Sequence, residues 1–319
     1  MDSVFSQEMM GMINFYDDHY FLSPLALNTG HKIYLGDMSN RECRFCGTKD
    51  PGLFRLEAHA FPEFIGNKEL ISNYECDICN ERFSRTIEDH LAKYTLLDRT
   101  IAQIKGKRGF PSVKSRSKRS RITVANNNID IAYHPDDNCV DIDLDNRRVS
   151  IHGFRQPYIP RLAFKCLVKM AISLLPENEL HHFTETIKWL NIENPSDDPV
   201  TTQDAFSSMC SFTPGPKPFP WIMAALMKRK TDTAALPFMI FFIAFSHFTF
   251  QIAIPLSDMD SHLIGKKLTL PAFPNLYHDG TPLGKVKYFA INLSSNNMVS
   301  NEDNHISLHF DTCRKLEDK

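Results

Sequence analysis

The sequence predicts an α+β protein in which a small cysteine-bearing unit precedes a larger α+β domain with antiparallel strands. Three observations support this prediction. Four of the eight cysteines form two Cys-x-x-Cys pairs in the first quarter of the chain, a run of basic residues follows them, and from Ile122 onward short alternating strands mix with amphipathic helices. With 319 residues, of which 42% are hydrophobic, the chain is long enough for about two domains.

Composition divides the chain into four expected segments. They are an N-terminal leader (1–40), the cysteine-bearing unit (41–100), a basic linker or arm (101–121) and an α+β domain whose role the sequence leaves unknown (122–319). The leader carries Asp2 and Glu8 and has no basic stretch before an apolar core, so we do not expect a secretory signal. A cytoplasmic location follows as an expectation, and in that reducing compartment cysteine pairs favour metal binding over disulfides.

A long uncharged stretch, Thr233 to Leu256, requires a test for a membrane span. Pro237 interrupts it, and after His247 the apolar residues alternate with polar ones, as in Phe248, Phe250 and Ile252. A period of two is typical of a half-buried strand. We therefore expect a buried hairpin and no membrane partner, with a membrane-anchored protein as the weaker alternative.

The remaining elements of the larger domain follow from periodicity and from prolines. Pro160 is placed to begin a helix that runs to Leu174, and a second helix is expected from about Glu177 to Leu190 because apolar residues recur on one face of each. The proline-rich piece 214–220 cannot donate to a sheet and is expected to be an extended connector. Residues 286–293 and 305–310 are expected to be antiparallel strands.

The two cysteine pairs carry the strongest chemical signal. Cys43 and Cys46, followed after 29 residues by Cys76 and Cys79, supply four thiolates in two tight turns. Zn²⁺ prefers a closed tetrahedral sulfur site of this kind for a structural role. Because sulfur would fill all four positions, such a zinc ion has none left for a reactive water, and any catalysis must use other residues.

The segment between the cysteine pairs resembles the HNH endonucleases. The resemblance rests on the run His59-Ala60-Phe61-Pro62, on Ile65-Gly66 and on the run from Cys76 to Asn80. It covers residues 43 to about 98 and implies a zinc-containing treble-clef finger, the ββα-metal finger, that hydrolyses DNA phosphodiester bonds.

The resemblance also implies roles for individual residues. His59 would be the general base, since neutral imidazole accepts a proton near physiological pH. Asn80 would be an oxygen ligand to a catalytic Mg²⁺ or Mn²⁺. The middle Asn of the family's motif, which holds the loop that orients the histidine, would be Asn73 or, as a second choice, Asn67.

One position departs from the family's pattern. Many relatives carry an acidic metal ligand directly before the histidine, whereas here that position is Ala58 and the acid is Glu57. On a strand Glu57 and His59 would share a face, so Glu57 is a candidate to orient His59 or to reach the metal. Glu75, Glu88 and His90 are kept as candidate helpers.

The basic arm points to nucleic acid as a partner, because lysines and arginines that neutralise phosphates provide affinity independent of sequence. Phe110 is its only aromatic residue, so we expect it to follow the DNA backbone, with a solvated linker as the alternative. Its eight basic residues are Lys105, Lys107, Arg108, Lys114, Arg116, Lys118, Arg119 and Arg121.

The sequence therefore predicts a metal-dependent HNH endonuclease that acts on DNA, as in bacterial restriction or phage defence, with a homo-oligomer or defence-system proteins as further partners. With 36 basic and 38 acidic residues the net charge is −2, which excludes a wholly basic DNA-packaging protein. The alternative is a non-catalytic zinc finger that binds DNA or protein and needs neither His59 nor a second metal.

Overall fold

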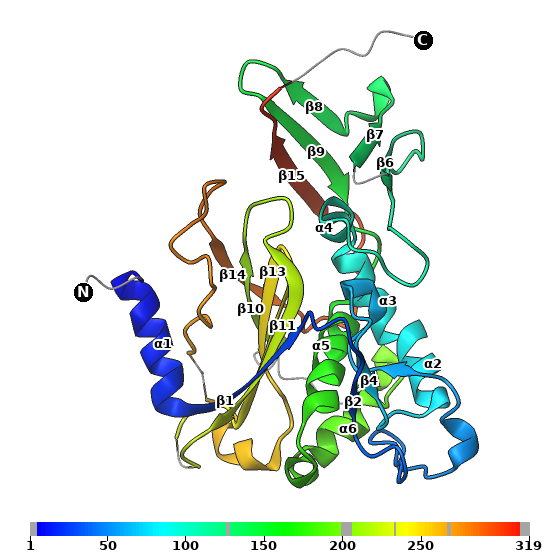
Figure 1. Ribbon diagram of the computed structural model, residues 1–319, viewed down its shortest axis with the longest axis vertical. Helices are drawn as coiled ribbons and strands as arrows, with labels where there is room; N and C mark the ends of the chain where they lie inside the picture. The colour runs from blue at the N-terminus through cyan, green and yellow to red at the C-terminus, as the bar shows by residue number, and fades with distance from the viewer. Residues whose placement is uncertain (1–4, 126–127, 199–205, 233, 267–268, 313–319) are drawn as a thin grey trace.

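The computed structural model describes residues 5–125, 128–198, 206–232, 234–266 and 269–312. It confirms the mixed α+β class with antiparallel sheets. Figure 1 shows a six-stranded sheet beside a bundle of helices, the cysteine-bearing finger on the far side of those helices, and a small β unit at one end of the molecule.

The largest element is a six-stranded antiparallel sheet in the order β1-β11-β12-β13-β10-β14. Its strands are β1 (Tyr20–Leu27), β10 (Ser207–Phe212), β11 (Phe219–Arg229), β12 (Met239–Ser246), β13 (Phe248–Ala253) and β14 (Lys287–Asn292). Strands β12 and β13 form the hairpin that the alternation after His247 predicts, and β14 lies where residues 286–293 predict a strand. Thr233, where the uncharged stretch begins, lies outside the described residues.

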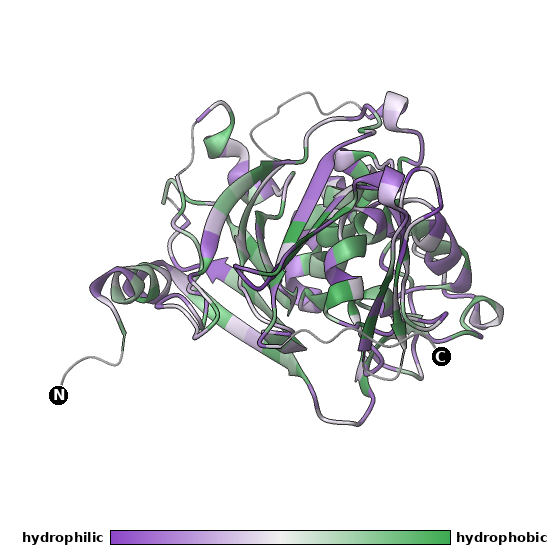
Figure 2. Ribbon diagram, turned by 90° about the horizontal axis from the view of Figure 1, so that it is seen from above, coloured by the Kyte–Doolittle hydropathy of each residue, from purple (hydrophilic) through white to green (hydrophobic). Residues whose placement is uncertain are grey.

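Strand β12 is apolar from Met239 to Phe245 because both faces of the sheet are covered. Met239, Phe241, Ile243 and Phe245 belong to the main hydrophobic core, whereas Ile240, Phe242 and Ala244 belong to a second cluster on the opposite face. Figure 2 shows hydrophobic residues gathered on the sheet strands and the helices beside them. In the part of the chain that the structure describes, no helix is both long and apolar enough to cross a membrane.

Helices cover the two faces of this sheet. Helix α1 (Gln7–His19) lies over the smaller cluster, where the Tyr16 ring packs edge-on against Phe273. Helix α5 (Pro160–Leu174) packs on the other face and has the predicted bounds. The second predicted helix is divided into a 3-10 helix, Glu177–Phe183, and α6 (Thr184–Leu190).

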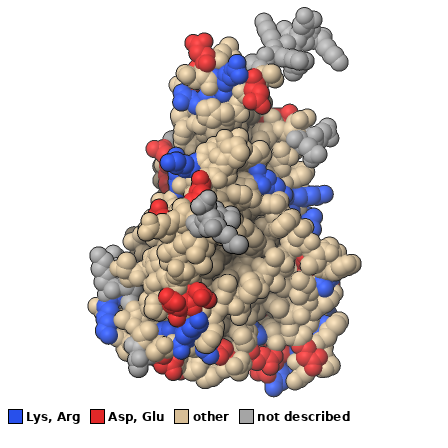
Figure 3. All heavy atoms as spheres, turned by 60° about the vertical axis from the view of Figure 1, so that its left-hand side comes forward, with Lys and Arg blue, Asp and Glu red and all other residues tan. Residues whose placement is uncertain are grey.

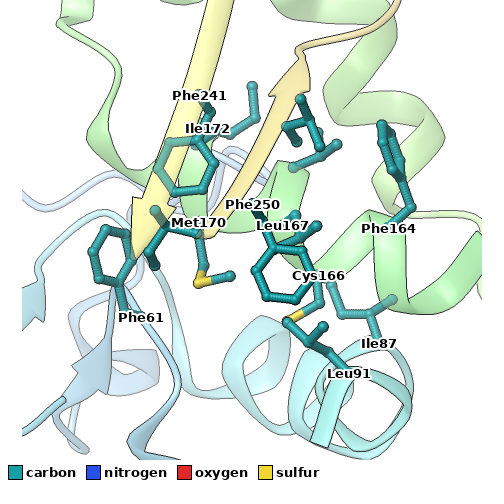
Figure 4. Close-up of a cluster of buried hydrophobic side chains, with 14 of the residues drawn as sticks. Phe61, Ile87, Leu91, Phe164, Cys166, Leu167, Met170, Ile172, Phe241 and Phe250 are labelled. Carbon is teal, nitrogen blue, oxygen red and sulfur yellow. The ribbon is translucent and has the colours of Figure 1, made fainter. Parts of the chain in front are cut away.

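The finger shares the main core with the sheet. It comprises β2 (Ile33–Leu35), β3 (Ala58–His59), β4 (Leu70–Ser72), α2 (Asp77–Arg85), α3 (Ile87–Tyr94) and α4 (Leu96–Ile101). In Figure 4 Phe61 and Leu91 of the finger lie against Met170 and Leu167 of α5 and the sheet residues Phe241 and Phe250. The cysteine-bearing finger, α5 and the large sheet therefore share one hydrophobic core.

The expected leader is divided between two sheets. Strand β1 pairs antiparallel with β11 of the large sheet, and β2 pairs parallel with β4 of the finger. The first 40 residues thus contribute one strand to the large sheet and one to the finger.

The small β unit contains most of the basic arm. One three-stranded sheet consists of β5 (Val113–Lys114), β6 (Arg121–Ala125) and β7 (Asn128–Ala132), and the other of β8 (Val140–Asp143), β9 (Arg148–Phe154) and β15 (Asp303–His309). Ile122 and Ile151 pack with Leu97 and Ile101 of α4, so this unit rests on the end of the finger helices. The strand predicted at residues 305–310 is β15, which returns from the C-terminal region to pair with β9.

Candidate functional site

Four cysteine side chains converge at one end of the finger. The Sγ atoms of Cys43, Cys46, Cys76 and Cys79 lie within 4.8 Å of one another, and those of Cys46 and Cys76 are 3.6 Å apart. Zinc–sulfur bonds of about 2.3 Å in a tetrahedron place the sulfurs about 3.8 Å apart. The cluster therefore has the donor set and the spacing of a structural zinc site, as the sequence predicts.

Hydrogen-bond donors surround these sulfurs. The pKa of Cys43 is lowered, first by the Cys79 thiol and then by backbone N–H groups, among them that of Cys76 at 3.5 Å. Burial raises the pKa of Cys76, and the Cys43 thiol, followed by burial, raises the pKa of Cys79. The Arg82 guanidinium lies 3.6 Å from the Cys79 sulfur. Such donors favour thiolates, which is the form of cysteine that binds zinc.

The finger is attached to the ends of two helices of the larger region. Asn191, directly after α6, donates to the carbonyl of Phe45 at 2.6 Å and accepts a hydrogen bond from Arg82. Arg44 donates to the carbonyl of Ile172 near the end of α5 at 2.9 Å. Both cysteine turns are therefore held in a fixed orientation relative to α5 and α6.

His59 is half-buried on the short strand β3, where it pairs with Ile71 of β4. Burial lowers the pKa of its imidazole below the ordinary value, and the ammonium groups of Lys169 and Lys107 lower it further. The carboxylates of Glu63 and Glu57 act in the opposite direction. The net shift favours neutral imidazole near pH 7, the form that accepts a proton.

The loop that follows His59 is held by Asn67. Its buried amide donates to the carbonyls of Phe61 at 2.8 Å and Leu70 at 3.0 Å, and its oxygen accepts from the backbone N–H of Leu70 at 2.9 Å. Gly66 just before it has a φ of 100°, which favours glycine. Asn67 thus joins the two ends of the loop between β3 and β4.

Asn73 holds a different loop. It is buried, its backbone N–H donates to Leu35 at 2.8 Å, and its amide donates to the carbonyl of Gly36 at 3.1 Å. These contacts join the end of β4 to the end of β2. Asn67 therefore holds the loop that follows His59, whereas Asn73 holds the junction of β4 and β2, and the choice between them as the middle Asn of the motif stays a prediction.

Asn80 lies in the first turn of α2, where its backbone N–H donates to the carbonyl of Cys76 at 2.9 Å. Its half-buried side chain makes no hydrogen bond with any residue that the structure describes. The amide oxygen is thus available to a ligand, and its role as a metal ligand stays a prediction.

Two acids lie close to His59 in different settings. Glu57 precedes β3 and directs both carboxylate oxygens to Lys32 at 2.6 Å, at an exposed position. Glu63 begins the 3-10 turn Glu63–Ile65, and its charge acts on both His59 and Glu88. The role of Glu57 stays a prediction, and Glu63, which the sequence does not single out, is a second acid whose charge acts on His59.

Lys169 of α5 contacts several of the candidate residues from the interior of the protein. Its fully buried Nζ lies 2.9 Å from Glu75, 3.4 Å from Glu88 and 3.1 Å from the carbonyl oxygen of His59. Burial disfavours the ammonium, but the two carboxylates outweigh this effect and raise the pKa of Lys169. Burial likewise raises the pKa of Glu75 to about 7, which Lys169 opposes.

Sequence reasoning missed Lys169 because it lies 110 residues after His59. The sequence did carry one sign of a buried charge, since Lys165 and Lys169 are one turn apart in a helix that is otherwise almost wholly apolar.

His90, kept as a candidate helper, accepts the backbone N–H of Ile159 at 2.9 Å and so joins α3 to the start of α5.

The basic arm consists of two parts. The turn from Lys105 to Arg108 lies against the loop after His59, since a Cβ on Gly106 would be 3.4 Å from the Cα of Phe64. Lys114 to Arg121 belong to the β5–β6 hairpin. In the face shown in Figure 3, basic and acidic side chains are interspersed, so this face is not uniformly basic.

All eight basic side chains of the arm are exposed, but two have partners within the chain. Arg119 pairs with Asp136 at 3.2 Å, and Arg116 contacts Asn301. The other six make no ion pair with the described residues. These six are Lys105, Lys107, Arg108, Lys114, Lys118 and Arg121.

Comparison with known proteins gives one match. Residues 43–96 match the family model described as HNH endonuclease, and this segment contains the four cysteines, His59 and Asn80. No curated protein and no solved structure matches the chain. The match confirms the resemblance of the finger, whereas the remainder of the chain is described by its fold alone.

The first prediction concerns the cysteine cluster. Cys76→Ser should remove most bound zinc and lower the melting temperature, because zinc binding to such modules contributes roughly 10 kcal/mol or more to their folding. Metal analysis and thermal unfolding of purified protein measure both effects. Cys139→Ser, a half-buried cysteine outside the cluster, should leave both unchanged. Full zinc content with unaltered melting in Cys76→Ser would contradict a zinc role for these thiols.

The second prediction concerns the pKa of His59. Lys107→Gln removes a positive charge that lowers this pKa, so the imidazole should protonate at a higher pH than in the wild type. NMR titration of the His59 ring, assigned by comparison with His59→Ala, measures the shift. Lys114→Gln, an equally exposed change in the hairpin, should not move it. The assigned electrostatics are incorrect if the His59 titration in Lys107→Gln stays unchanged or moves to lower pH.

Proposed function

We propose that the protein is a metal-dependent endonuclease that hydrolyses DNA phosphodiester bonds, with His59 as the general base. The main support for the proposal is the position of His59 and the lowered pKa of its imidazole. His59 is a half-buried histidine with a lowered pKa on a strand of a zinc-type finger, inside the segment that matches the HNH endonuclease family.

Hydrolysis of a phosphodiester requires a base that takes a proton from water and positive charge near the phosphate. Neutral imidazole at His59 supplies the base. The backbone at His59 is held by the β3–β4 pairing, by the loop that Asn67 holds and by Lys169 on the His59 carbonyl. A base in a fixed position performs this step best because little reorganisation is needed as the proton moves.

The positive charge would come from a divalent cation. Mg²⁺ and Mn²⁺ prefer oxygen ligands, and the amide oxygen of Asn80 fits that preference, as does the carboxylate of Glu63, whose charge acts on His59. Such an ion stabilises the charge that develops on the phosphate and on the leaving oxygen. Among the described residues, the cysteine cluster is the one group of three or more metal-ligating Cys, His, Asp or Glu side chains. DNA phosphates and water would therefore complete the shell around the cation.

The arm would hold the DNA. Six of its cations have no acidic partner among the described residues, and the Lys105–Arg108 turn lies beside the loop after His59. Contacts from these cations to phosphates would align the duplex without reading its sequence. A role in restriction or phage defence, with partner proteins or as a homo-oligomer, stays a prediction from the sequence.

The lack of a preassembled acidic metal site in the described residues favours a second function, a zinc finger that binds DNA without cutting it. In that function His59 would be a structural residue of the finger. The two functions make opposite predictions for substitution of His59.

The third prediction separates them. His59→Ala should lower DNA cleavage by about 10²- to 10⁴-fold, the usual contribution of a general base, while zinc content and DNA binding stay near wild type. Plasmid digestion with Mg²⁺, metal analysis and binding to labelled duplex measure the three properties. His309→Ala, an exposed histidine on β15, is the matched control. Cleavage by His59→Ala at the wild-type rate would assign the finger to binding alone.

The fourth prediction concerns Asn80. Asn80→Ala should cleave slowly at low Mg²⁺ and recover in part as Mg²⁺ or Mn²⁺ is raised, because one oxygen ligand is lost while the phosphate ligands remain. Asn80→Asp keeps an oxygen ligand and should retain activity at lower Mg²⁺. Cleavage rates measured across metal concentrations test both variants. A defect in Asn80→Ala that no metal concentration relieves would show that Asn80 serves the fold of α2.

A further inference from the structure

An open cleft of about 360 Å³ lies next to the loop that follows His59. Its walls come from residues 65–69 of that loop, from residues 103–105 with Phe110 of the arm, and from Lys217 and residues 219–222 at the start of β11. The ends of β1 and β12 complete it. The cleft is thus formed by the finger, the arm and the large sheet together. None of the chemistry assigned to His59 or to the cysteines uses it.

Two aromatic rings stand at this cleft without a ring partner. Trp221 is 48% exposed and Phe110 is 40% exposed. In the described part of the chain neither ring stacks on another ring or on a cation. Trp221 projects where the register of β11 with β12 is interrupted, between Phe219 and Met223, and such irregularities redirect side chains. Exposed rings at a concave site are typical of a surface that binds a flat partner.

The cleft is also positively charged. Lys68, Lys105 and Lys217 line it with exposed side chains. The one acid in its wall, Glu69, accepts hydrogen bonds from the backbone of Thr29 and Gly30 at 3.1 Å. Aromatic rings combined with cations are the features by which proteins bind unpaired nucleotides, through base stacking and phosphate contacts.

We propose that this cleft binds an unpaired nucleotide of the DNA substrate, with its base against Trp221 and Phe110 and its phosphates near the three lysines. The inference rests on the proposed function, because it places this nucleotide on the strand presented to His59. The volume lies at the low end of the roughly 300–1,000 Å³ typical of small-ligand pockets, which suits one nucleotide.

The position of the cleft connects it to the candidate active site. Gly66 and Asn67 line the cleft, and the Asn67 amide donates to the carbonyl of Phe61, two residues after His59. Lys105 lines the cleft as well, and Lys107, two residues later, acts on the pKa of His59. A strand with an unpaired nucleotide seated here would pass close to His59, so the enzyme should prefer gapped or frayed DNA to intact duplex.

Binding measured without divalent cations tests the proposal independently of cleavage. Trp221 is the exposed member of the two tryptophans, since Trp189 is buried, so a base stacked on it should quench the fluorescence of the protein. An oligothymidylate strand should quench wild type, and Trp221→Ala should bind it at least about fivefold more weakly, the low end for base–aromatic stacking. Trp221→Phe should restore most of the affinity.

Salt dependence separates stacking from charge. Trp221→Ala should leave the slope of log affinity against log salt unchanged, whereas Lys105→Gln and Lys217→Gln should each reduce it by about 0.7, the value for one phosphate contact on a single strand. Phe21→Ala, an exposed aromatic on β1 outside the cleft, should change neither affinity nor slope.

Three outcomes would overturn the proposal. They are wild-type affinity in Trp221→Ala, an equal loss of affinity in Phe21→Ala, or free nucleoside monophosphates that bind as tightly as the strand, which would indicate a small-molecule site. Failure of the proposed function is seen separately. In that case the wild type would bind the strand through Trp221 and yet cleave no DNA with Mg²⁺ or Mn²⁺.

Discussion

The arrangement of the candidate site depends on one buried cation. The ammonium of Lys169 contacts the His59 carbonyl, Glu75 just before a cysteine ligand, and Glu88 of α3. A buried charge is tolerated only when it is paired, and removal of one partner costs about 3–5 kcal/mol. This ion network, together with the apolar core that the finger shares with α5, sets the orientation of the finger relative to the sheet.

This dependence changes the role of the C-terminal region. Zinc would order the finger internally, but α5, α6 and the large sheet determine where the finger points. The same region supplies β11, which forms a wall of the cleft beside the loop after His59. The residues beyond the finger therefore contribute to the candidate site in two ways. Helices α5 and α6 hold the finger in position, and β11 forms part of the cleft beside the loop after His59.

Local patterns predicted much of this structure, and contacts between distant residues account for what they missed. The cysteine cluster, α5 and the β12–β13 hairpin follow from short-range spacing and period, which a sequence displays directly. The pairings of β1 and β2 and the place of Lys169 depend on which segments meet in space. The residue types in the sequence do not show which distant segments pair or pack together.

The central claim is that this finger cuts DNA with a divalent cation that is distinct from its zinc. Its most direct test is digestion of a supercoiled plasmid by the zinc-loaded wild-type chain, with and without added Mg²⁺ or Mn²⁺, on a preparation whose zinc content is measured. The account predicts one zinc per chain and nicked or linear plasmid only when the second metal is present. A folded preparation with its zinc that binds the plasmid and leaves it supercoiled at every metal concentration would contradict the account.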